Sequence, residues 1–255
     1  MNALILAAGL GTRLGTYTAD RPKALVEVAG RTMLEHQLHR LHDAGFDRIV
    51  INVHHFADSI TGFLRRHDNF GMDITISDES GQLLDTGGGI RQAFHLLQDD
   101  APLLVHNVDI FSTTDLRALY DGHLSCGADA TLHTAERSTS RYLHFDSDMR
   151  LRGWSNEKTG RTRSPFPDFD RSVCTPMAFQ GIHVLSRSTL PLLDAVPADS
   201  FSITDFYVDN AARLRLRAVS ESAGSWVDAG KPEALPRAAE IASGFTASHR
   251  DTVKQ

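Results

Sequence analysis

Runs of β-branched and aliphatic residues alternate with helical patterns along the first 109 residues, which leaves few folds open to the chain. Helices are expected between successive strands, and the strands themselves are expected at ALILAA (3–8), RIVINV (48–53), MDITIS (72–77) and PLLVHNVD (102–109). Strand–helix–strand repeats of this kind form parallel sheets covered by helices. The sequence therefore predicts an α/β fold, a single three-layer αβα domain with a mostly parallel, Rossmann-like mixed sheet.

The rest of the chain continues the pattern less regularly. Further strands are expected at 129–134 and 178–185, and further helices near 113–125, 203–212 and 231–242. The segment 155–176 is polar and carries prolines, so we expect a long loop there. We find no linker long enough to separate two domains. One domain is predicted over residues 1–242, followed by a polar C-terminal tail over 243–255 that lacks apolar periodicity.

A glycine-rich stretch, AAGLGTRLG (7–15), directly follows the first expected strand. Gly9, Gly11 and Gly15 allow the backbone to turn tightly and to direct successive N–H groups at an anion, for which phosphate is the natural occupant. Arg13 adds a guanidinium, and Lys23 adds an ammonium eight residues after the last of these glycines. Backbone donors with two such cations suit a triphosphate.

Two common phosphate-binding motifs are not matched by the sequence. A dinucleotide fingerprint needs a third glycine where Leu14 stands and a helix where Thr16 to Pro22 follow, so a nicotinamide-dependent oxidoreductase is disfavoured. A Walker A loop fails at Gly230-Lys231, because Ser225 replaces its first glycine and Pro232 follows the lysine.

Composition narrows the class of function. Hydrophobic residues make up 41% of the chain, which is ordinary for a globular protein, and no apolar run reaches membrane-spanning length. The net charge of -6 argues against non-specific binding of nucleic acid. Only Cys126 and Cys174 are present, and no basic segment precedes the first apolar run, so we expect a cytoplasmic protein without a membrane partner.

Longer motifs give the glycine loop a specific context. GLGTRL followed by RPKALVEVAGRTMLEHQL resembles the signature of the sugar-1-phosphate nucleotidyltransferases, and further similar motifs follow in the same order. These are LDTGGGI (84–90), HNVDIF (106–111), NEK (156–158), FQGIHVL (179–185) and SWVDAGKPEAL (225–235). In the motif LDTGGGI and in length, the sequence most resembles the proteins of one bacterial branch of this family. That branch includes uridylyltransferases for N-acetylmuramate 1-phosphate and guanylyltransferases for mannose or heptose phosphates.

The resemblance implies attack by a sugar 1-phosphate oxygen on the α-phosphorus of an NTP, with pyrophosphate as leaving group. The second pKa of a phosphate monoester is about 6, so the nucleophile is ionised at neutral pH and the catalytic demand is electrostatic. Mg²⁺ suits this demand because it binds through one or two carboxylates together with substrate phosphates. Asp109, at the end of an expected strand, and Asp228, in SWVDAG, are the expected metal ligands.

The same resemblance implies roles for other residues. Arg13 and Lys23 join Asp109 as the expected catalytic residues, and Glu157, Lys158 and Gly181 are expected to bind the sugar phosphate. The expected nucleotide-binding residues are Ala8, Gly9, Gly11, Thr12, Arg13, Lys23, Thr86, Gly87, Gly88 and Asn107. We expect the two glycines at 87 and 88 to let the backbone lie against the base.

Two departures from the family pattern leave alternatives open. Val108 stands where glycine is usual, which adds a β-branched side chain beside Asp109, and Lys231 stands where threonine is common. UTP with an N-acetylhexose, hexose or muramate 1-phosphate is the favoured substrate pair, and GTP with mannose or heptose 1-phosphate is the alternative. A non-catalytic module that senses a nucleotide or an NDP-sugar is a further alternative. The sequence does not indicate an oligomeric state.

Overall fold

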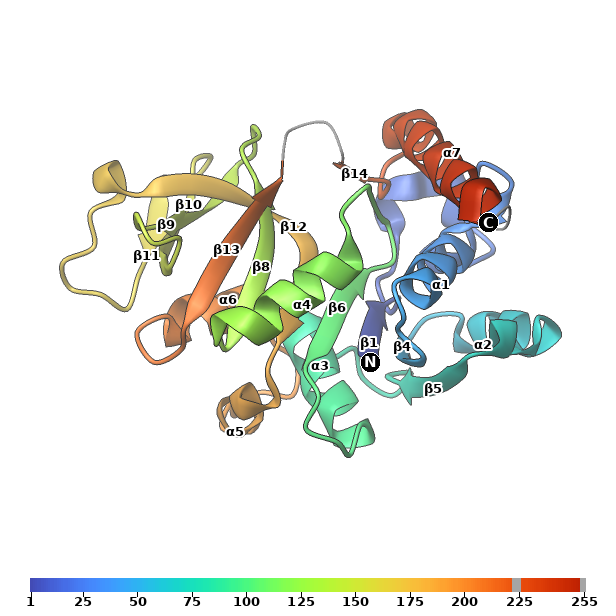
Figure 1. The fold of residues 1–255 in the computed structure, drawn as a ribbon, viewed down its shortest axis with the longest axis horizontal. Helices are drawn as coiled ribbons and strands as arrows, with labels where there is room; N and C mark the ends of the chain where they lie inside the picture. The colour runs from blue at the N-terminus through green and yellow to red at the C-terminus, as the bar shows by residue number, and fades with distance from the viewer. Residues whose placement is uncertain (222–225, 253–255) are drawn as a thin grey trace. The chain divides into compact units, whose positions relative to one another are not determined.

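The computed structural model describes residues 1–221 and 226–252, and the chain forms two compact units (Figure 1). Unit 1 contains residues 1–83 and 106–116 and, at the C-terminal side, the described residues from 226 onward. Unit 2 contains residues 84–105 and the described residues from 117 to 221. Three separate stretches of chain therefore build unit 1.

Three parallel strands lie at the centre of unit 1: β1 (Asn2–Leu6), β4 (Arg48–Val53) and β5 (Asp73–Asp78). β4 pairs with both of the others, so that Ile5 faces Ile51 and Ile51 faces Ile76. Every residue of β1 and all but the first of β4 are buried. Continuous apolar runs are typical of parallel strands that are covered on both faces, and these runs form the expected strands.

Short elements and helices complete unit 1. They are the 3₁₀ helices η1 (Thr12–Thr18), η2 (Lys23–Leu25), η3 (Asp68–Gly71) and η6 (Pro232–Ala234), the strands β2 (Glu27–Val28), β3 (Arg31–Thr32), β7 (Ile110–Ser112) and β14 (Trp226–Asp228), and the helices α1 (Met33–Asp43), α2 (Ala57–Arg66) and α7 (Leu235–Thr252). The start of α1 is fixed by Thr32, whose hydroxyl accepts a hydrogen bond from the Glu35 amide at 3.1 Å. A threonine followed three residues later by glutamate is the capping-box pattern.

A second set of strands, mostly antiparallel, forms the centre of unit 2. Its elements are α3 (Asp85–Leu96), α4 (Leu116–Cys126), β8 (Ala130–Ala135), β9 (Arg141–Phe145), β10 (Leu151–Asn156), β11 (Arg161–Arg163), η4 (Arg171–Val173), β12 (Thr175–Leu185), η5 (Arg187–Thr189), α5 (Leu190–Asp194), α6 (Ile203–Asn210) and β13 (Leu216–Glu221). The strands pair in the order β11, β10, β9, β12, β8, β13, and the pair of β8 and β13 is parallel. β6 (Leu103–Asn107) then leads from unit 2 into unit 1.

The α/β class with a mixed sheet is confirmed, whereas several local expectations were wrong. The segment 155–176 is not a continuous loop, because it contains the end of β10, all of β11 and the start of β12. The last helix does not end at 242 but continues as α7 to Thr252, and Phe245 lies in it with its ring 6.5 Å from that of Phe111. Residues 253–255 of the expected tail lie outside the described residues. The single domain over 1–242 stays a prediction.

None of the described helices combines the length and the apolar character that crossing a membrane requires.

Candidate active site

The glycine-rich loop begins where β1 ends, and its first residues are held by a buried side chain. Asn52, on β4, accepts hydrogen bonds through Oδ1 from the amides of Ala7 and Ala8, at 2.6 and 3.2 Å. Gly11 follows with a φ of 66°, in the left-handed region that favours glycine. The next element is the 3₁₀ helix η1 and not an α-helix, so the loop departs from the dinucleotide-binding pattern, as expected.

Lys23 lies against this loop. A Cβ placed on Gly11 would lie only 2.9 Å from Cβ of Lys23, and one placed on Gly9 would lie 3.6 Å from its Nζ. Both glycines thus face the lysine, and Gly11 could not carry a side chain without displacing it. Pro22 precedes Lys23 with extended backbone and fixes the start of η2, which directs the lysine back over the loop.

Strand pairing in unit 1 brings the two expected metal ligands together. Asp109 lies between β6 and β7, and Asp228 is the last residue of β14. The antiparallel register of β14 and β7 places Asp228 opposite Ile110, and the amide of Ala229 donates to the Asp109 carbonyl at 2.8 Å. A pairing of three residues on each strand is therefore enough to align two aspartates that are far apart in the sequence.

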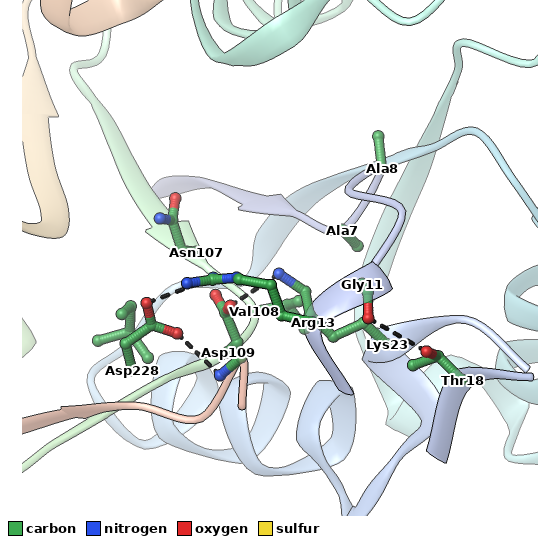
Figure 2. A network of polar contacts seen from close by, with 12 residues as sticks. Ala7, Ala8, Gly11, Arg13, Thr18, Lys23, Asn107, Val108, Asp109 and Asp228 are labelled. Atoms are coloured by element: carbon green, nitrogen blue, oxygen red, sulfur yellow. Dashed lines mark hydrogen bonds and ion pairs between the residues drawn. The ribbon is translucent and has the colours of Figure 1, made fainter. Parts of the chain in front are cut away.

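Each aspartate has a cationic partner from the glycine-loop region (Figure 2). Nζ of Lys23 lies 2.8 Å from Oδ2 of Asp109, and both side chains are largely buried, with exposed fractions of 13% and 6%. Nη2 of Arg13 lies 3.5 Å from Oδ2 of Asp228 in a more exposed pair. The four formal charges sum to zero, so the site is neutral before any substrate or metal binds.

Gly230 marks the point on which these groups converge. A Cβ placed on it would lie 2.6 Å from Nη2 of Arg13, 2.7 Å from Oδ1 of Asp228 and 3.0 Å from Oδ2 of Asp109. Its amide also donates to Oδ1 of Asp228 at 2.8 Å. Any side chain at position 230 would therefore occupy the space that the two carboxylates and the guanidinium share.

Opposing effects act on the pKa of the Asp109 carboxyl. Burial is the largest single effect and favours the neutral acid, but the charge and the hydrogen bond of the Lys23 ammonium, together with further hydrogen bonds to the carboxyl, hold the pKa below its usual range. Asp109 is therefore an anion at neutral pH, as a metal ligand must be.

The donor set fits Mg²⁺. Within residues 1–221 and 226–252, no three side chains of the His, Cys, Asp and Glu types gather as a closed metal cage. Asp109 and Asp228 instead offer two carboxylates around the space at Gly230. Mg²⁺ commonly binds through one or two carboxylates and fills its other positions with water and substrate phosphate, so these two aspartates would hold it.

Three further residues from the sequence motifs also lie in unit 1, close in sequence to Asp109 or to the glycine loop. Asn107 is the last residue of β6, two positions before Asp109, and Figure 2 shows it at that strand end. Val108 is fully buried, and its amide donates to the Leu6 carbonyl at 3.2 Å. The β-branched side chain that departs from the family pattern therefore packs in the core. Thr12 is the first residue of η1.

Close packing explains why glycines are needed in LDTGGGI, an explanation that sequence analysis missed. A Cβ on Gly87 would lie 2.3 Å from the Phe201 ring, and one on Gly88 would lie 2.2 Å from the Asp199 carbonyl oxygen. The amide of Gly87 donates to the Phe201 carbonyl at 2.8 Å, and the Thr86 hydroxyl accepts from the Ile203 amide at 2.9 Å. Close packing of α3 on this segment of unit 2 thus requires both glycines, and their contact with a base stays a prediction.

The residues expected to bind the sugar phosphate also lie in unit 2. Glu157 and Lys158 directly follow β10, and the Lys158 amide donates to Asn156 Oδ1 at 3.0 Å. Gly181 has a φ of 75° and lies where the register of β12 with β8 shifts between Phe179 and His183. A bulge of this kind needs left-handed backbone, which accounts for the glycine.

Sequence analysis missed several residues that contact the expected ones. Asn52 supports the glycine loop, and Ser155 and Arg171 donate hydrogen bonds to Glu157 at 2.7 and 3.2 Å. Asn52 gave one available signal, since it is a polar residue that interrupts the apolar run of RIVINV near the end of the strand. Ser155 and Arg171 carry no such signal.

Comparison with known proteins identifies the family to which the chain belongs. Residues 3–168 match the model of the MobA-like NTP transferase domain. The chain belongs to this family of NTP transferases. The match confirms the family suggested by the glycine loop and the later motifs, and with it a nucleotidyltransferase enzyme.

Curated relatives cover almost the whole chain. The chain is 35% identical over 239 residues to an N-acetylmuramate alpha-1-phosphate uridylyltransferase of Caulobacter vibrioides, covering 91% of this chain and 93% of that protein. It is 31% identical over 242 residues to a mannose-1-phosphate guanyltransferase of Yarrowia lipolytica, again over 91% of this chain but only 61% of the relative. The chain therefore spans the length of the first relative and about three fifths of the second.

Solved structures share the fold. A putative glucose-1-phosphate thymidylyltransferase of Bacillus anthracis superposes with a TM-score of 0.78 at 18% identity, covering 95% of each chain. HddC from Yersinia pseudotuberculosis, in complex with GMP-PN, superposes with a TM-score of 0.71 at 24% identity, covering 94% of this chain and 98% of HddC. These likenesses support the α/β fold of this NTP transferase.

Proposed function

We propose that the protein is a Mg²⁺-dependent uridylyltransferase that forms a UDP-sugar and pyrophosphate from UTP and an N-acetylhexose, hexose or muramate 1-phosphate. The observation that carries the proposal is the convergence of Asp109, Asp228, Arg13 and Lys23 around the space beside Gly230. The uridylyltransferase relative, which the chain matches over 93% of its length, favours the base and the sugar. The cytoplasm, where nucleoside triphosphates are made, is the proposed compartment.

The reaction depends on electrostatic stabilisation of the phosphates more than on a general base from the protein. A phosphate oxygen of the sugar 1-phosphate attacks the α-phosphorus of UTP, the bond to the β-phosphate oxygen breaks, and pyrophosphate leaves with that electron pair. Bound Mg²⁺ supplies charge neutralisation on the phosphates and helps to orient them. Asp109 and Asp228 would hold the ion, while Lys23 would donate to oxygens at the α-phosphorus, where charge is redistributed in the transition state.

The glycine loop and Arg13 would hold the β- and γ-phosphates. The Ala8 amide already donates to Asn52, so we assign phosphate binding to the amides that follow it, from Gly9 to Thr12. Arg13 is exposed and only loosely paired with Asp228, at 3.5 Å, so it can turn from the carboxylate to a phosphate at little cost. In unit 2, Glu157 would accept hydrogen bonds from sugar hydroxyls and Lys158 would bind the sugar phosphate.

Guanylyl transfer to mannose 1-phosphate is the second candidate, because the chain is 31% identical to a mannose-1-phosphate guanyltransferase. Pyrophosphate release, measured with UTP and with GTP against the 1-phosphates of N-acetylmuramate, N-acetylglucosamine and mannose, separates the two. We expect turnover with UTP and an N-acetylated sugar, and none when Mg²⁺ is chelated.

The control for this experiment is Lys23→Ala, which we expect to lower kcat by about a hundredfold while changing the KM for UTP less. Turnover only with GTP and mannose 1-phosphate would favour the second candidate. Nucleotide binding without turnover on any pair would instead favour a nucleotide-sensing module.

A further inference from the structure

A line of hydrogen bonds inside unit 2 leads from a buried histidine to Glu157. His144 lies on β9 and Ser155 on β10, two antiparallel strands in which His144 pairs with Gly153. Because side chains two residues apart on a strand share a face, Ser155 lies diagonally across from His144. Nε2 of His144 is 2.9 Å from the Ser155 hydroxyl, which donates to Oε1 of Glu157 at 2.7 Å.

The protons along this line can be assigned. A serine hydroxyl has one proton, and Ser155 donates it to Glu157, so His144 must donate to the serine from Nε2. Nδ1 is then the unprotonated nitrogen, and it has no hydrogen-bond partner among the described residues. An unpaired acceptor on a neutral ring is tolerable, whereas a proton on Nδ1 would leave a buried donor unsatisfied.

Burial keeps the histidine neutral and in place. The exposed fractions of His144 and Ser155 are 4% and 0%, and burial is the main cause of the lowered pKa of His144. Phe169 lies edge-on to the His144 ring, at 5.8 Å between centroids, and fills the space over Gly153, where a Cβ would lie 2.6 Å from its ring. The histidine therefore has one tautomer and one ring orientation.

Glu157 also has an exposed partner, and the two contacts differ in kind. Nη1 of Arg171 lies 3.2 Å from the same oxygen, Oε1, with about half of each side chain exposed. An exposed ion pair contributes little to fixing a geometry, because water and salt screen it. The buried donor, Ser155, is therefore the contact that fixes the carboxylate. No described side chain donates to Oε2, which is the oxygen left for a ligand.

We infer that His144 and Ser155 are positioning residues that hold Glu157 so that Oε2 accepts hydrogen bonds from hydroxyls of the sugar 1-phosphate. The inference rests on the proposed function, because it assigns the sugar to the site at Glu157. Neither residue touches substrate in this arrangement; both act through the carboxylate.

Kinetics of matched variants test the role. Ser155→Ala should raise the KM for the sugar 1-phosphate about tenfold or more, because it removes a hydrogen bond to a charged group, and leave the KM for UTP unchanged. Arg171→Gln should change either constant by no more than about twofold, as expected for an exposed pair. His144→Leu should resemble Ser155→Ala, whereas His144→Gln, which keeps a donor near the Nε2 position, should recover most of the loss.

Three results would overturn the inference. In a Glu157→Ala background, Ser155→Ala should add little further loss, and losses that multiply would show that serine acts independently of Glu157. A ¹⁵N NMR spectrum with the His144 proton on Nδ1 would refute the hydrogen-bond line whatever the activity. A larger effect of Arg171→Gln than of Ser155→Ala would assign the positioning to the arginine. Absence of sugar 1-phosphate turnover in the unmodified protein would refute the proposed function itself, while the NMR spectrum would still report on the line.

Discussion

Two aspartates separated by 119 positions, Asp109 and Asp228, define the candidate active site at the scale of single residues. The ion pairs that the two aspartates form differ in strength. The contact between Lys23 and Asp109 is short and buried, whereas the contact between Arg13 and Asp228 is long and exposed. A buried pair loses much more when one member is removed, since the other charge is left in a poorly solvated place. The lysine and Asp109 therefore form the rigid half of the site.

If the two carboxylates share one Mg²⁺, their effects on turnover should not be additive. Asp109→Asn and Asp228→Asn should each lower kcat by about a hundredfold or more, and the double variant should be little worse than either one. Steady-state kinetics at saturating Mg²⁺ measure this. Asp20→Asn, which removes an exposed carboxylate paired with Arg21, is the control and should be silent. Single losses that multiply in the double variant would show two separate roles.

His183 is fully buried on β12, and neither of its ring nitrogens has a hydrogen-bond partner among the described residues. Burial lowers its pKa from the ordinary value of 6.5 to about 3. Between these values the unfolded chain binds a proton that the folded protein does not, so the stability due to this residue is complete above 6.5 and is lost as the pH falls.

The loss due to His183 should reach about 2 kcal/mol at about pH 5 relative to about pH 7.5. Replacement by leucine should therefore flatten the pH dependence of unfolding by that amount, as measured by urea titration at the two pH values. The same replacement at exposed His55 is the control. An unchanged pH dependence in His183→Leu would contradict the prediction.

At the scale of elements, β4 does more than complete the sheet of unit 1. Near its end, Asn52 bonds the amides of Ala7 and Ala8 through Oδ1 and donates through Nδ2 to Oε1 of buried Glu79 at 2.8 Å. One amide side chain thus joins the end of β4 to the start of the glycine loop and to the residue that follows β5. The loop takes its starting direction from this contact.

Asn52→Ala should lower the free energy of unfolding by about 2–4 kcal/mol, because it leaves two buried N–H groups without an acceptor. It should also raise the KM for the nucleotide. Asn52→Asp keeps the acceptor but places a second carboxylate against Glu79, so we expect it to be no better than alanine. Denaturant unfolding measures both, with exposed Gln82→Ala as the control. Full stability in Asn52→Asp would contradict the assignment of Nδ2 to Glu79.

The same element shows what the sequence could predict and why. RIVINV was expected as a strand over 48–53 and forms one with those bounds, because a continuous apolar run between turns is a local signal. β9, β10, β11 and β13 were missed, since they are short or carry polar residues. β9, β10 and β11 pair with their neighbours in sequence, whereas β13 pairs with β8, which lies far back along the chain. The polar, proline-containing composition of residues 155–176 predicted a loop, although β11 and parts of β10 and β12 lie there.

Over the whole molecule, the residues of the site could be predicted from the sequence, but the ion pairs between them could not. The motifs supplied Arg13, Lys23, Asp109 and Asp228 in advance. Nothing in the sequence indicated that Lys23 would pair with a residue 86 positions away, or Arg13 with one 215 positions away. The contact of Arg13 with Asp228 depends on the three-residue pairing of β14 with β7, which is too short to recognise from a pattern. Supporting residues such as Ser155 and Asn52 become visible only through their hydrogen bonds.

Unit 1 is assembled from stretches at the beginning, middle and end of the chain. Of the four site residues, the ribosome makes Arg13 and Lys23 first, Asp109 next and Asp228 last, while domains tend to fold as their residues emerge. A nascent chain that ends before β14 would have Lys23 and Asp109 but not Asp228. The enzyme is therefore expected to acquire its second carboxylate only after β14 has been made, and a product that terminates before β14 would lack activity even if its earlier strands had formed.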